Sequence, residues 1–503
     1  MPQLQRHIQK FAPEIESKTL FQYDLAVSPH LAAQVSKRVG RCLLTLPEQW
    51  LVSSASLTFP PANQHIPSDN ALLDEIARAA AHEARRNSGW LFVETAGGVH
   101  SPSPSGTTQA DLYMPLRLPV VLVGDSKLGG ISQTISAFES LKIRGYDVET
   151  VLLFQEDQYQ NYLYLAEYFE QKHGIPVKTV PEPPQRAQDS KSDAQAMSQY
   201  YNTNSAGPAL HETLTHLDTR HKSRIARLES MSTTASHKIW YPFTQQKHVT
   251  PSKITVIDSA HGDYFQTLAP PNNPNDALLQ PSFDASASWW TQGLGHANPS
   301  LSLAAAHAAG RYGHVMFAEA VHEPALALAE TLLGGMRNPR LTRAFFSDNG
   351  STGTEVALKM ALRAARVRYG WKNGQRAGVL GLQGSYHGDT IGAMDCSEPG
   401  VFNEKVEWYE GRGYWFAGPT VWRTSGKAWE VVVPAEMEGP GGGGRFASLD
   451  DVFDVEAREA RGEHHAYERF IIARLEKLAA EGRRFGALMI EPVVLGAGGM
   501  LLV

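Results

Sequence analysis

The sequence predicts an α/β protein with parallel sheets and more than one domain. Short apolar runs at 118–123 and 148–154 flank a stretch at 130–142 whose apolar residues recur at helical spacing. Strands that alternate with helices indicate a parallel sheet, which binds its ligands at the carboxyl ends of the strands. With 503 residues, the chain is longer than an ordinary single domain.

The composition excludes several classes of function. Apolar residues make up 42% and charged residues 19%, as in ordinary globular proteins. The formal net charge of −6 gives no electrostatic basis for binding nucleic acid or an anionic membrane. Cys42 and Cys396 are far apart, so we predict buried thiols and no disulfide or zinc site between them. No apolar run is long enough to span a bilayer, and the first residues are not typical of a secretory signal.

The predicted first domain covers residues 1–180. It contains a helix at 71–86 and a short apolar strand at 90–93. Gly-containing turns follow two of the predicted strands, at 94–99 and at 124–134. Both turns therefore fall at the edge where a parallel sheet binds its ligands.

These segments resemble the dethiobiotin synthetases, an ATP-dependent family with a P-loop-type sheet, at 28–33, 94–98 and 118–130. The resemblance implies that Glu94 holds Mg²⁺ at the ATP phosphates, since a carboxylate is a hard oxygen ligand. For one carboxylate at a strand end, an ordinary solvated side chain is the alternative. The resemblance also implies four substrate-binding residues: Gly97, Gly98, Ile131 and Ser132. The last two, at a helix amino end, would bind the carboxylate of 7,8-diaminopelargonate held by a neighbouring subunit.

The first domain departs from this family in two places. Thr95 stands where the family usually has Gly. The family's first strand and its phosphate-binding loop, G-x-x-x-x-G-K-[ST], do not occur in the sequence. Because that loop carries much of the phosphate binding, we expect a chain truncated at its amino end and impaired as a synthetase.

Residues 181–236 are predicted to link the two domains. A polar run predicts a linker or mobile loop at 185–205. One exposed helix is expected at 211–231, with several Arg and Lys residues on it. Acidic residues are interspersed among them, which favours a solvated helix over a nucleic-acid-binding one.

The second half, residues 237–503, is organised around the stretch 345–355. Two aromatic residues at its start predict a strand, and a run of helical periodicity follows a small polar turn. Gly350 and Ser351 in this turn lie at a helix amino end, where unpaired N–H groups and the helix dipole favour an anion. For such a turn alone, an ordinary helix cap is the commoner explanation.

Three further motifs accompany the turn, at 288–296, 384–390 and 487–493. In this order, the four motifs resemble the fold-type I, class III aminotransferases, which use pyridoxal 5′-phosphate (PLP). The Trp289–Trp290 pair and the stretch 237–244 narrow the resemblance to the adenosylmethionine–8-amino-7-oxononanoate aminotransferases.

The resemblance implies a PLP site. Gly350 and Ser351 would anchor the phosphate, Tyr386 would stack on the pyridine ring, and Glu491 would lie near that ring. Substrate-binding roles are implied for four residues: Trp289, Trp290, Phe243 and Asp389. Phe243 stands where bacterial relatives carry Tyr, so a hydroxyl contact is lost there. Each aromatic residue alone is better explained by core packing, and the combination of motifs supports the site.

Two parts of the family's PLP site cannot be assigned. In the family, the Lys that binds PLP and the Asp that pairs with the ring nitrogen come later than the point matched by Val503, and Lys359 does not match by motif. We therefore expect truncation at the carboxyl end as well. Residues 400–450, rich in Trp, are expected to form an insertion. The glycine run at 438–444 is not a dinucleotide site, because we expect no strand before it and no helix after it.

The sequence thus predicts a P-loop-type domain followed by an incomplete fold-type I domain, in a bifunctional enzyme of biotin biosynthesis. The implied reactions are amino transfer from S-adenosylmethionine to 8-amino-7-oxononanoate, and ATP- and Mg²⁺-dependent formation of dethiobiotin from 7,8-diaminopelargonate and CO₂. The alternatives are another class III transaminase, acting on ornithine or an ω-amino acid, and a catalytically dead binding protein. Both families imply a homodimer. The resemblance implies the mitochondrial matrix, and otherwise the protein would be cytoplasmic.

Overall fold

The computed structural model describes residues 66–85, 90–204, 207–242, 244–270, 278–315, 318–372, 374–424, 426, 428–437, 441–497 and 499–501. The chain divides into two compact units, Met1–Val315 and Met316–Val503. The finer domain boundaries near residues 180 and 236 stay a prediction. In the described parts of the chain, no helix combines the length and the apolar character needed to cross a membrane.

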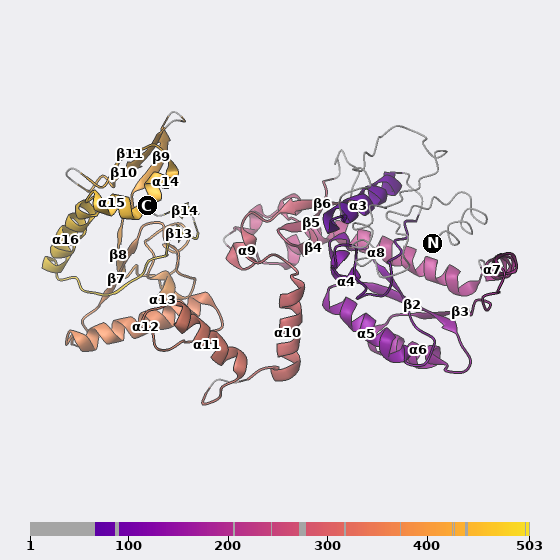
Figure 1. Ribbon diagram of the computed structural model, residues 1–503. Helices are drawn as coiled ribbons and strands as arrows, with labels where there is room; N and C mark the ends of the chain where they lie inside the picture. Colours follow the sequence, from indigo (N-terminus) through magenta and orange to yellow (C-terminus); the bar gives the residue numbers. More distant parts are fainter. Residues whose placement is uncertain are drawn as a thin grey trace. The chain divides into compact units, whose positions relative to one another are not determined.

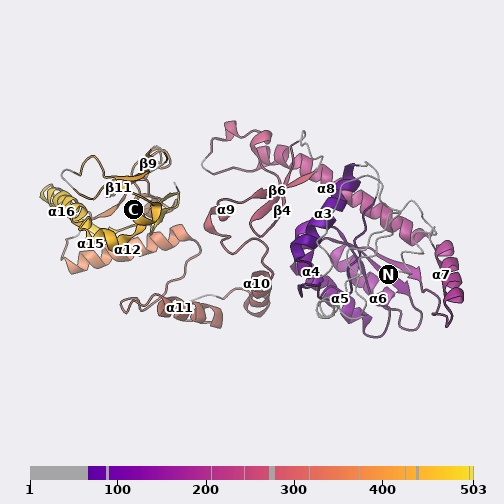
Figure 2. The same ribbon diagram turned by 45° about the horizontal axis from the view of Figure 1, so that its top comes forward.

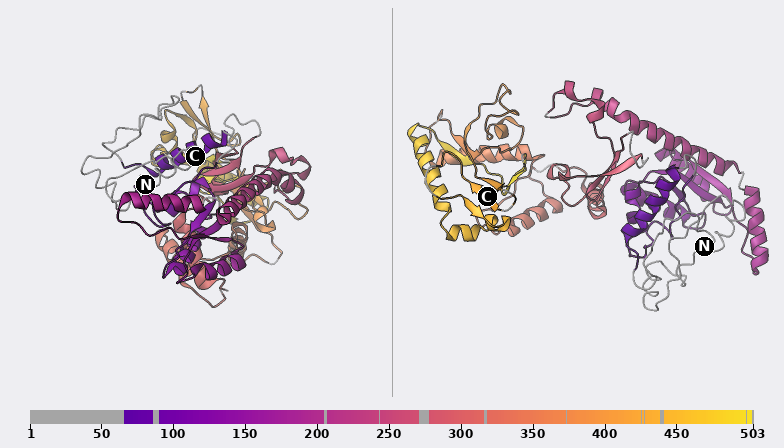
Figure 3. Two further views of the ribbon diagram at one scale, coloured as in Figure 1. Left: turned by 90° about the vertical axis from the view of Figure 1, so that its right-hand side faces the viewer. Right: turned by 90° about the horizontal axis from the view of Figure 1, so that it is seen from above.

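The first unit contains a three-stranded parallel sheet in the order β1-β2-β3 (Val120–Val123, Val148–Gln155 and Val177–Pro181). The crossover helices α5 (Gly130–Ile143) and α6 (Asn161–His173) cover one of its faces (Figure 1). The long helix α8 (Pro208–Lys238) packs against β2 and β3 on the other face (Figure 3). This arrangement confirms the predicted α/β class.

The core of this sheet is formed by large apolar side chains that are almost fully buried. Val151 and Leu153 of β2 pack with Leu165 and Phe169 of α6. Phe138 of α5 meets Phe169 edge to face, with ring centroids 5.0 Å apart. The predicted strands at 118–123 and 148–154 and the helix at 130–142 are therefore confirmed. The helix predicted at 71–86 is confirmed as α3 (Asp69–Arg85).

The strand predicted at 90–93 is wrong. These residues pair with no strand in the described structure, and Trp90 and Phe92 are 48% and 68% exposed. Their rings stack on each other at 5.9 Å instead. A run of four residues needs a neighbouring strand to satisfy its backbone groups, and the sequence pattern alone does not supply one.

The linker or mobile loop expected at 185–205 is also wrong for most of its length, because α7 (Ser190–Asn204) forms there. Asp189 precedes this helix, and its carboxylate accepts hydrogen bonds from the N–H groups of Lys191 and Ser192. Tyr200 ties the helix to the sheet by donating its hydroxyl to the carbonyl of Pro181. An acidic cap can therefore start a helix even in a polar segment.

The helix predicted at 211–231 is confirmed, within the longer α8. Two basic residues of α8 form ion pairs with acidic residues of the first unit. Arg220 lies 2.7 Å from Glu149, and Arg224 lies 2.7 Å from Asp258. These cations are neutralised within the protein, which agrees with the predicted solvated helix.

The remainder of the first unit is built from short elements. An antiparallel sheet has the order β4-β5-β6 (Ile257–His261, Tyr264–Leu268 and Leu279–Phe283). The helices of this part are α4 (Gln109–Leu112), η2 (Met114–Leu116), η3 (Gln246–His248), η4 (Pro251–Lys253), α9 (Ala287–Trp290) and α10 (Pro299–Tyr312).

In the second unit, β7 (Gly378–Leu382) lies between β12 (Phe485–Leu488) and β8 (Gly413–Phe416) in a parallel sheet. Helix α12 (Gly350–Arg368) packs along this sheet (Figure 2). Cys396 is fully buried against Leu358 and Val379, which confirms the buried thiol there. Cys42 lies outside the described residues.

The other elements of the second unit are α11 (Glu323–Gly335), α13 (Ile391–Met394), β9 (Thr420–Thr424), β10 (Ala428–Val432), β11 (Gly444–Phe446), α14 (Leu449–Phe453), α15 (Val455–Ala460), α16 (His464–Ala480), β13 (Val494–Leu495) and β14 (Met500–Leu501). Strands β9, β10 and β11 form an antiparallel sheet within the segment expected to be an insertion. Contrary to our expectation, a strand, β10, does precede the glycine run. The run leads into antiparallel β11 and not into a helix, so the rejection of a dinucleotide site is supported.

The strand expected from the aromatic pair before α12 is absent. Residues 341–347 form no ladder with any strand of the described structure, and Phe345 is exposed. The helix predicted after the turn is confirmed. The site therefore depends on the amino end of α12 and on the loop that follows β7, rather than on a strand that enters the turn.

Candidate functional site

The amino end of α12 is a capped helix terminus that remains open at its first residue. Asn349 accepts a hydrogen bond at its side-chain oxygen from the N–H of Thr352, at 2.9 Å. A Cβ atom added to Gly350 would meet no other atom within 4 Å. Gly350 and Ser351 thus occupy the first turn of a 19-residue helix whose dipole and terminal N–H groups favour an anion.

The loop at 384–390, which follows β7, is joined directly to this helix end. The N–H of Thr390 donates to the hydroxyl oxygen of Ser351 at 2.9 Å, and that hydroxyl donates to the Thr390 hydroxyl at 3.0 Å. Gly388 has φ +128°, and a Cβ atom there would collide with Ser351. The close approach of loop and helix therefore requires glycine at position 388.

Three carboxylates hold the backbone of this loop and of the turn after it. Glu491 accepts from the N–H of Tyr386 at 2.8 Å and, with its other oxygen, from the N–H of Gly496 at 2.6 Å. Glu398 accepts from the N–H of Gly384 at 2.7 Å, and Glu355 accepts from the N–H of Gly392 at 3.0 Å. Sequence reasoning identified Glu491 but assigned no role to Glu355, the last residue of the stretch 345–355, or to Glu398, which lies outside the motifs.

Tyr386 is 41% exposed and lies beside Asp389. Partial burial and a hydrogen bond to the Asp389 carboxylate both raise the pKa of the Tyr386 hydroxyl, so it stays protonated near neutral pH. Burial lowers the pKa of His387, and its Nε2 atom has no hydrogen-bond partner among the described residues. The loop therefore presents an aromatic ring and a neutral imidazole.

Four of the predicted site residues come together in the second unit: Gly350, Ser351, Tyr386 and Asp389. Glu491 joins them through the N–H of Tyr386. An open helix amino end suits a phosphate, and a partly exposed tyrosine ring suits a flat heteroaromatic ring. The residues present thus fit PLP.

Trp289 and Trp290 belong to the first unit, where they lie on one left-handed turn of backbone. The φ values of Ser288, Trp289 and Trp290 are 48°, 57° and 70°. Asp284 stabilises the turn by accepting from the hydroxyls of Ser286 and Ser288 and from His296. Burial opposes ionisation of Asp284, but these hydrogen bonds outweigh it and hold the pKa of the carboxyl well below its ordinary value.

This turn exposes 68% of Trp289 and 67% of Trp290. A left-handed conformation is costly for bulky residues, and such strain persists only where surrounding contacts enforce it. A fixed turn therefore holds the two rings exposed. This arrangement argues against core packing as the role of these two residues. Phe243, the remaining predicted substrate residue of this half, lies outside the described residues.

The loop between β1 and α5 is fixed chiefly by neutral side chains, although the Asp125 carboxylate also accepts from the N–H of Lys127. Asn161 donates from its amide to the carbonyls of Asp125 and Lys127, at 3.0 Å and 2.8 Å. Ser126 donates to the carbonyl of Phe154 at 2.7 Å, and Thr134 accepts from the N–H of Asp125 at 3.1 Å. The loop is thus anchored to β2 and to both crossover helices.

Ile131 and Ser132 lie in the first turn of α5, directly after this loop. The side chain of Ile131 packs against the core of the sheet, whereas Ser132 is exposed. A substrate carboxylate would therefore meet the Ser132 hydroxyl and the terminal backbone N–H groups, and not the Ile131 side chain.

Thr95, which stands where the dethiobiotin synthetases usually have Gly, stabilises the turn at 94–98. The Thr95 hydroxyl donates to the carbonyl of Gly97, and the N–H of Gly97 donates to the carbonyl of Thr95, both at 2.9 Å. Glu94 is exposed, and a Cβ atom on Gly98 would meet nothing within 4 Å. The turn is open to solvent, as a ligand-binding turn needs to be, and the proposed metal role of Glu94 rests on the resemblance.

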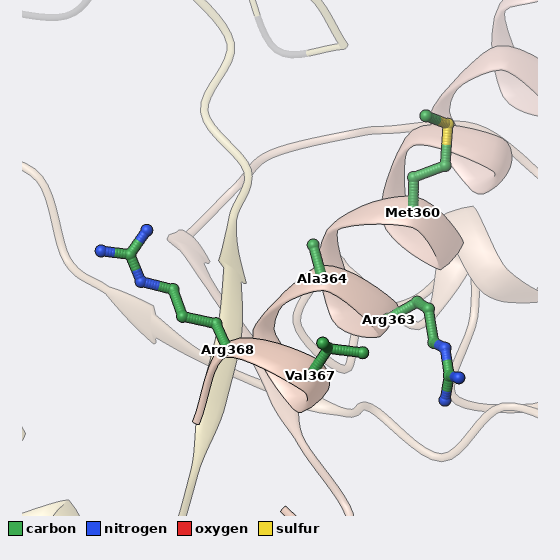
Figure 4. Close-up of a pocket in the computed structure, with 5 residues that line it drawn as sticks. All are labelled: Met360, Arg363, Ala364, Val367 and Arg368. Atoms are coloured by element: carbon green, nitrogen blue, oxygen red, sulfur yellow. The ribbon is translucent and has the colours of Figure 1, made fainter. Parts of the chain in front are cut away.

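A shallow hollow on the outer face of α12 is separate from this site. Figure 4 shows that one helix supplies its whole lining, which consists of Met360, Arg363, Ala364, Val367 and Arg368. It lies along the later turns of α12, whereas the predicted anion site is at the first turn.

Comparison with known proteins defines the class. An AAA domain model matches residues 8–186, and a class-III aminotransferase model matches residues 280–406. The chain therefore joins an AAA-type domain, a class that uses ATP and Mg²⁺, to a class III aminotransferase domain, a class that uses PLP.

Two curated relatives match the chain over nearly its whole length. The chain is 49% identical, over 99% of its length, to the bifunctional dethiobiotin synthetase/adenosylmethionine-8-amino-7-oxononanoate aminotransferase of Emericella nidulans, of which it covers 60%. It is 38% identical, over 98% of its length, to the bifunctional dethiobiotin synthetase/7,8-diamino-pelargonic acid aminotransferase, mitochondrial, of Arabidopsis thaliana, of which it covers 56%. The chain is similar to these bifunctional proteins over nearly its whole length, and it spans somewhat more than half the length of these relatives.

Solved structures overlap less closely. An amine transaminase from an uncultivated Pseudomonas species is 24% identical and gives a TM-score of 0.38, with 53% of this chain and 50% of that chain covered.

Proposed function

We propose that this chain carries the PLP-binding and substrate-binding parts of an aminotransferase that makes 7,8-diaminopelargonate, fused to part of a dethiobiotin synthetase. The observation that supports it most is the union of α12 with the loop at 384–390 through Ser351 and Thr390. That union joins the helix end that we propose for the phosphate to the loop that carries Tyr386. When bound, PLP would supply an electron sink for moving an amino group from S-adenosylmethionine to 8-amino-7-oxononanoate.

The protein's own residues would position this chemistry. Gly350 and Ser351 would bind the phosphate through backbone N–H groups, and Tyr386 would cover one face of the ring. Asp389 would orient Tyr386 and the substrate loop. Glu491 would act through Tyr386, whose N–H it holds, rather than by touching the cofactor. Trp289 and Trp290 would line the substrate pocket, with Phe243 as a further wall.

In the first unit, we assign Glu94 to Mg²⁺ and Gly97 and Gly98 to close approach of the substrate. Ser132 and the amino end of α5 would bind the diaminopelargonate carboxylate. The two activities have a chemical connection, because the diamine made by the second half is the substrate of the first. CO₂ would carboxylate one amine of the diamine, ATP would phosphorylate the carbamate, and the second amine would then close the ring of dethiobiotin with release of phosphate.

The assembly that fits these sites is a homodimer, because the α5 site is proposed to serve a substrate held by a neighbouring subunit. Sedimentation of a fully active monomer would contradict it. The plant relative is named as mitochondrial, and we propose the same compartment for this protein. Localisation of a fluorescent fusion to the cytosol alone would contradict that proposal.

Product analysis by mass spectrometry tests the proposed function, using the protein at its full natural length. S-adenosylmethionine, 8-amino-7-oxononanoate and PLP should give 7,8-diaminopelargonate. Addition of ATP, Mg²⁺ and bicarbonate should carry the product on to dethiobiotin. Glu94→Gln should abolish the second step and leave the first nearly unchanged, since Glu94 is assigned to the metal alone. Equal loss of both steps would show a folding role for Glu94 instead.

A further inference from the structure

The first turn of α16 carries two histidines and a glutamate that the proposed reactions do not use. His464 and His465 open the helix, and Glu468 follows one turn later. One possible ligand atom from each of these three residues lies within 4.8 Å of the others. We propose that His464, His465 and Glu468 bind a divalent transition-metal ion of the zinc type.

The two imidazole rings are close enough to share an ion. Their centroids are 4.0 Å apart, and a possible ligand atom of each ring lies within 4.8 Å of the other, so one ion can reach both. Nδ1 of His465 lies 3.0 Å from a carboxylate oxygen of Glu468. The Glu468 carboxylate is therefore close enough to supply a third ligand.

An orphaned polar atom is the second, independent observation. Nδ1 of His464 is buried and has no hydrogen-bond partner among the described residues. A buried polar atom without a partner is unfavourable, and native structures satisfy nearly all such atoms with protein, water or a bound ion. The ring of His464 therefore has a polar atom without a partner, and it lies beside two further possible ligands, His465 and Glu468.

The turn that presents these residues is held in place by ion pairs. Glu463, immediately before α16, lies 2.7 Å from Nε of Arg458 and 2.8 Å from Nε of Arg461. Arg458 is buried and also donates to the carbonyl of Val452. The cluster thus stands on a supported turn rather than on a free chain segment, which lowers the ordering cost of binding an ion.

The donor set selects the kind of ion. Two imidazole nitrogens and one carboxylate oxygen suit Zn²⁺, whereas Mg²⁺ prefers oxygen ligands in octahedral geometry. His465 and Glu468 are 59% and 61% exposed, so a water molecule can supply the fourth ligand. The amino end of a helix disfavours a cation, which limits the affinity. We therefore expect a moderate site, of a strength typical of partly exposed sites rather than of structural zinc centres.

The test is titration of the chelator-treated full chain with ZnSO₄ by isothermal calorimetry, in the presence of excess Mg²⁺. One equivalent should bind in the wild type and in a His221→Ala control, which removes an exposed histidine from α8. The double variant His464→Ala/His465→Ala and the isosteric Glu468→Gln should each weaken binding by at least about tenfold. Circular dichroism would confirm that the variants are folded, as expected for changes at a surface turn.

Equal Zn²⁺ affinity in all four proteins would overturn the proposal, because the ion would then bind to other histidines of the chain. Failure of the wild type to bind Zn²⁺ would overturn it too, as would complete competition by Mg²⁺. None of these outcomes bears on the proposed aminotransferase or synthetase reactions, whose residues lie outside the cluster.

Discussion

The two loops that we propose to bind ligands are built on the same plan but held by different chemistry. In the first unit, the loop at 124–130 precedes α5 and is fixed chiefly by amide and hydroxyl groups, with Asn161 at its centre. In the second unit, the loop at 384–390 lies against α12 and is fixed chiefly by carboxylates, with Glu491 at its centre. Neutral anchors do not change with pH, whereas carboxylate anchors fail once they are protonated.

The two loops also differ in the space that they leave at the start of the adjoining helix. Gly130 is packed so closely that a Cβ atom would collide with the carbonyl of Asp125, whereas Gly350 at the start of α12 has open space before it. The first loop is therefore shaped by the protein itself. The second leaves room at the helix end for an external anion, which agrees with the phosphate proposed there.

The largest effect is expected for Gly388→Ala. Alanine is strained at φ +128°, and its methyl group would also collide with Ser351. We expect hydrogen exchange at residues 384–390 to speed up, reflecting a loss of about 1–3 kcal/mol in local stability. Gly374→Ala is the matched control, since it has φ +90° but open space around it. Equal effects of the two changes would show that strain alone, and not contact with Ser351, is responsible.

The next effect is expected in the first unit for Asn161→Ala. The change leaves the carbonyls of Asp125 and Lys127 without their amide donor, which should cost about 1–3 kcal/mol of local stability. Hydrogen exchange at 124–130 should speed up while exchange at 384–390 stays the same. Asn204→Ala, which loses a hydrogen bond within α7 only, should leave both loops unchanged. Faster exchange at both loops after Asn161→Ala would contradict the independence of the two anchors.

The smallest effect is the response to acid. Hydrogen bonds from Thr390, Lys359 and the N–H of Gly392 lower the pKa of Glu355 from its ordinary value of 4.5. A carboxyl whose pKa is lowered by folding stabilises the fold above its unfolded pKa, and this stabilisation disappears as pH falls through the folded pKa. Protection of the Gly392 amide, corrected for intrinsic exchange, should be constant between pH 7 and about pH 5 and decline below about pH 4.5. Glu355→Gln should remove this decline, and an unaltered decline would assign it to another carboxylate.

The sequence predicted what depends on local pattern and missed what depends on tertiary partners. The strand at 118–123, the helix after it and the helix after Asn349 follow from periodicity and caps, and the structure contains them. The strands expected at 90–93 and before α12 are absent, because a short apolar run becomes a strand only where another strand pairs with it. The helix at Ser190–Asn204 was missed because polar composition hid the cap at Asp189.

The candidate site shows the same division. Gly350, Ser351, Tyr386 and Asp389 were identified from motifs, and the structure brings them together in one unit. Glu355 ends the stretch 345–355 and Glu398 lies outside the motifs, and the backbone contacts of both were visible only in three dimensions. The role of Thr95 was likewise hidden, since a departure from a family pattern does not reveal that its hydroxyl closes a turn.

The central claim is that PLP binds at the amino end of α12 beside a loop held by Glu491. The most direct measurement is the equilibrium binding of PLP to the chain, by dialysis, for wild type, Glu491→Gln and the control Glu407→Gln, which alters an exposed glutamate. Glutamine can still accept one backbone hydrogen bond but loses the second, at a cost of about 1.4 kcal/mol or roughly tenfold in affinity. We predict saturable binding in the wild type and the control, with roughly tenfold weaker binding in Glu491→Gln. Equal affinity in all three proteins, or no saturable binding in the wild type, would contradict the account.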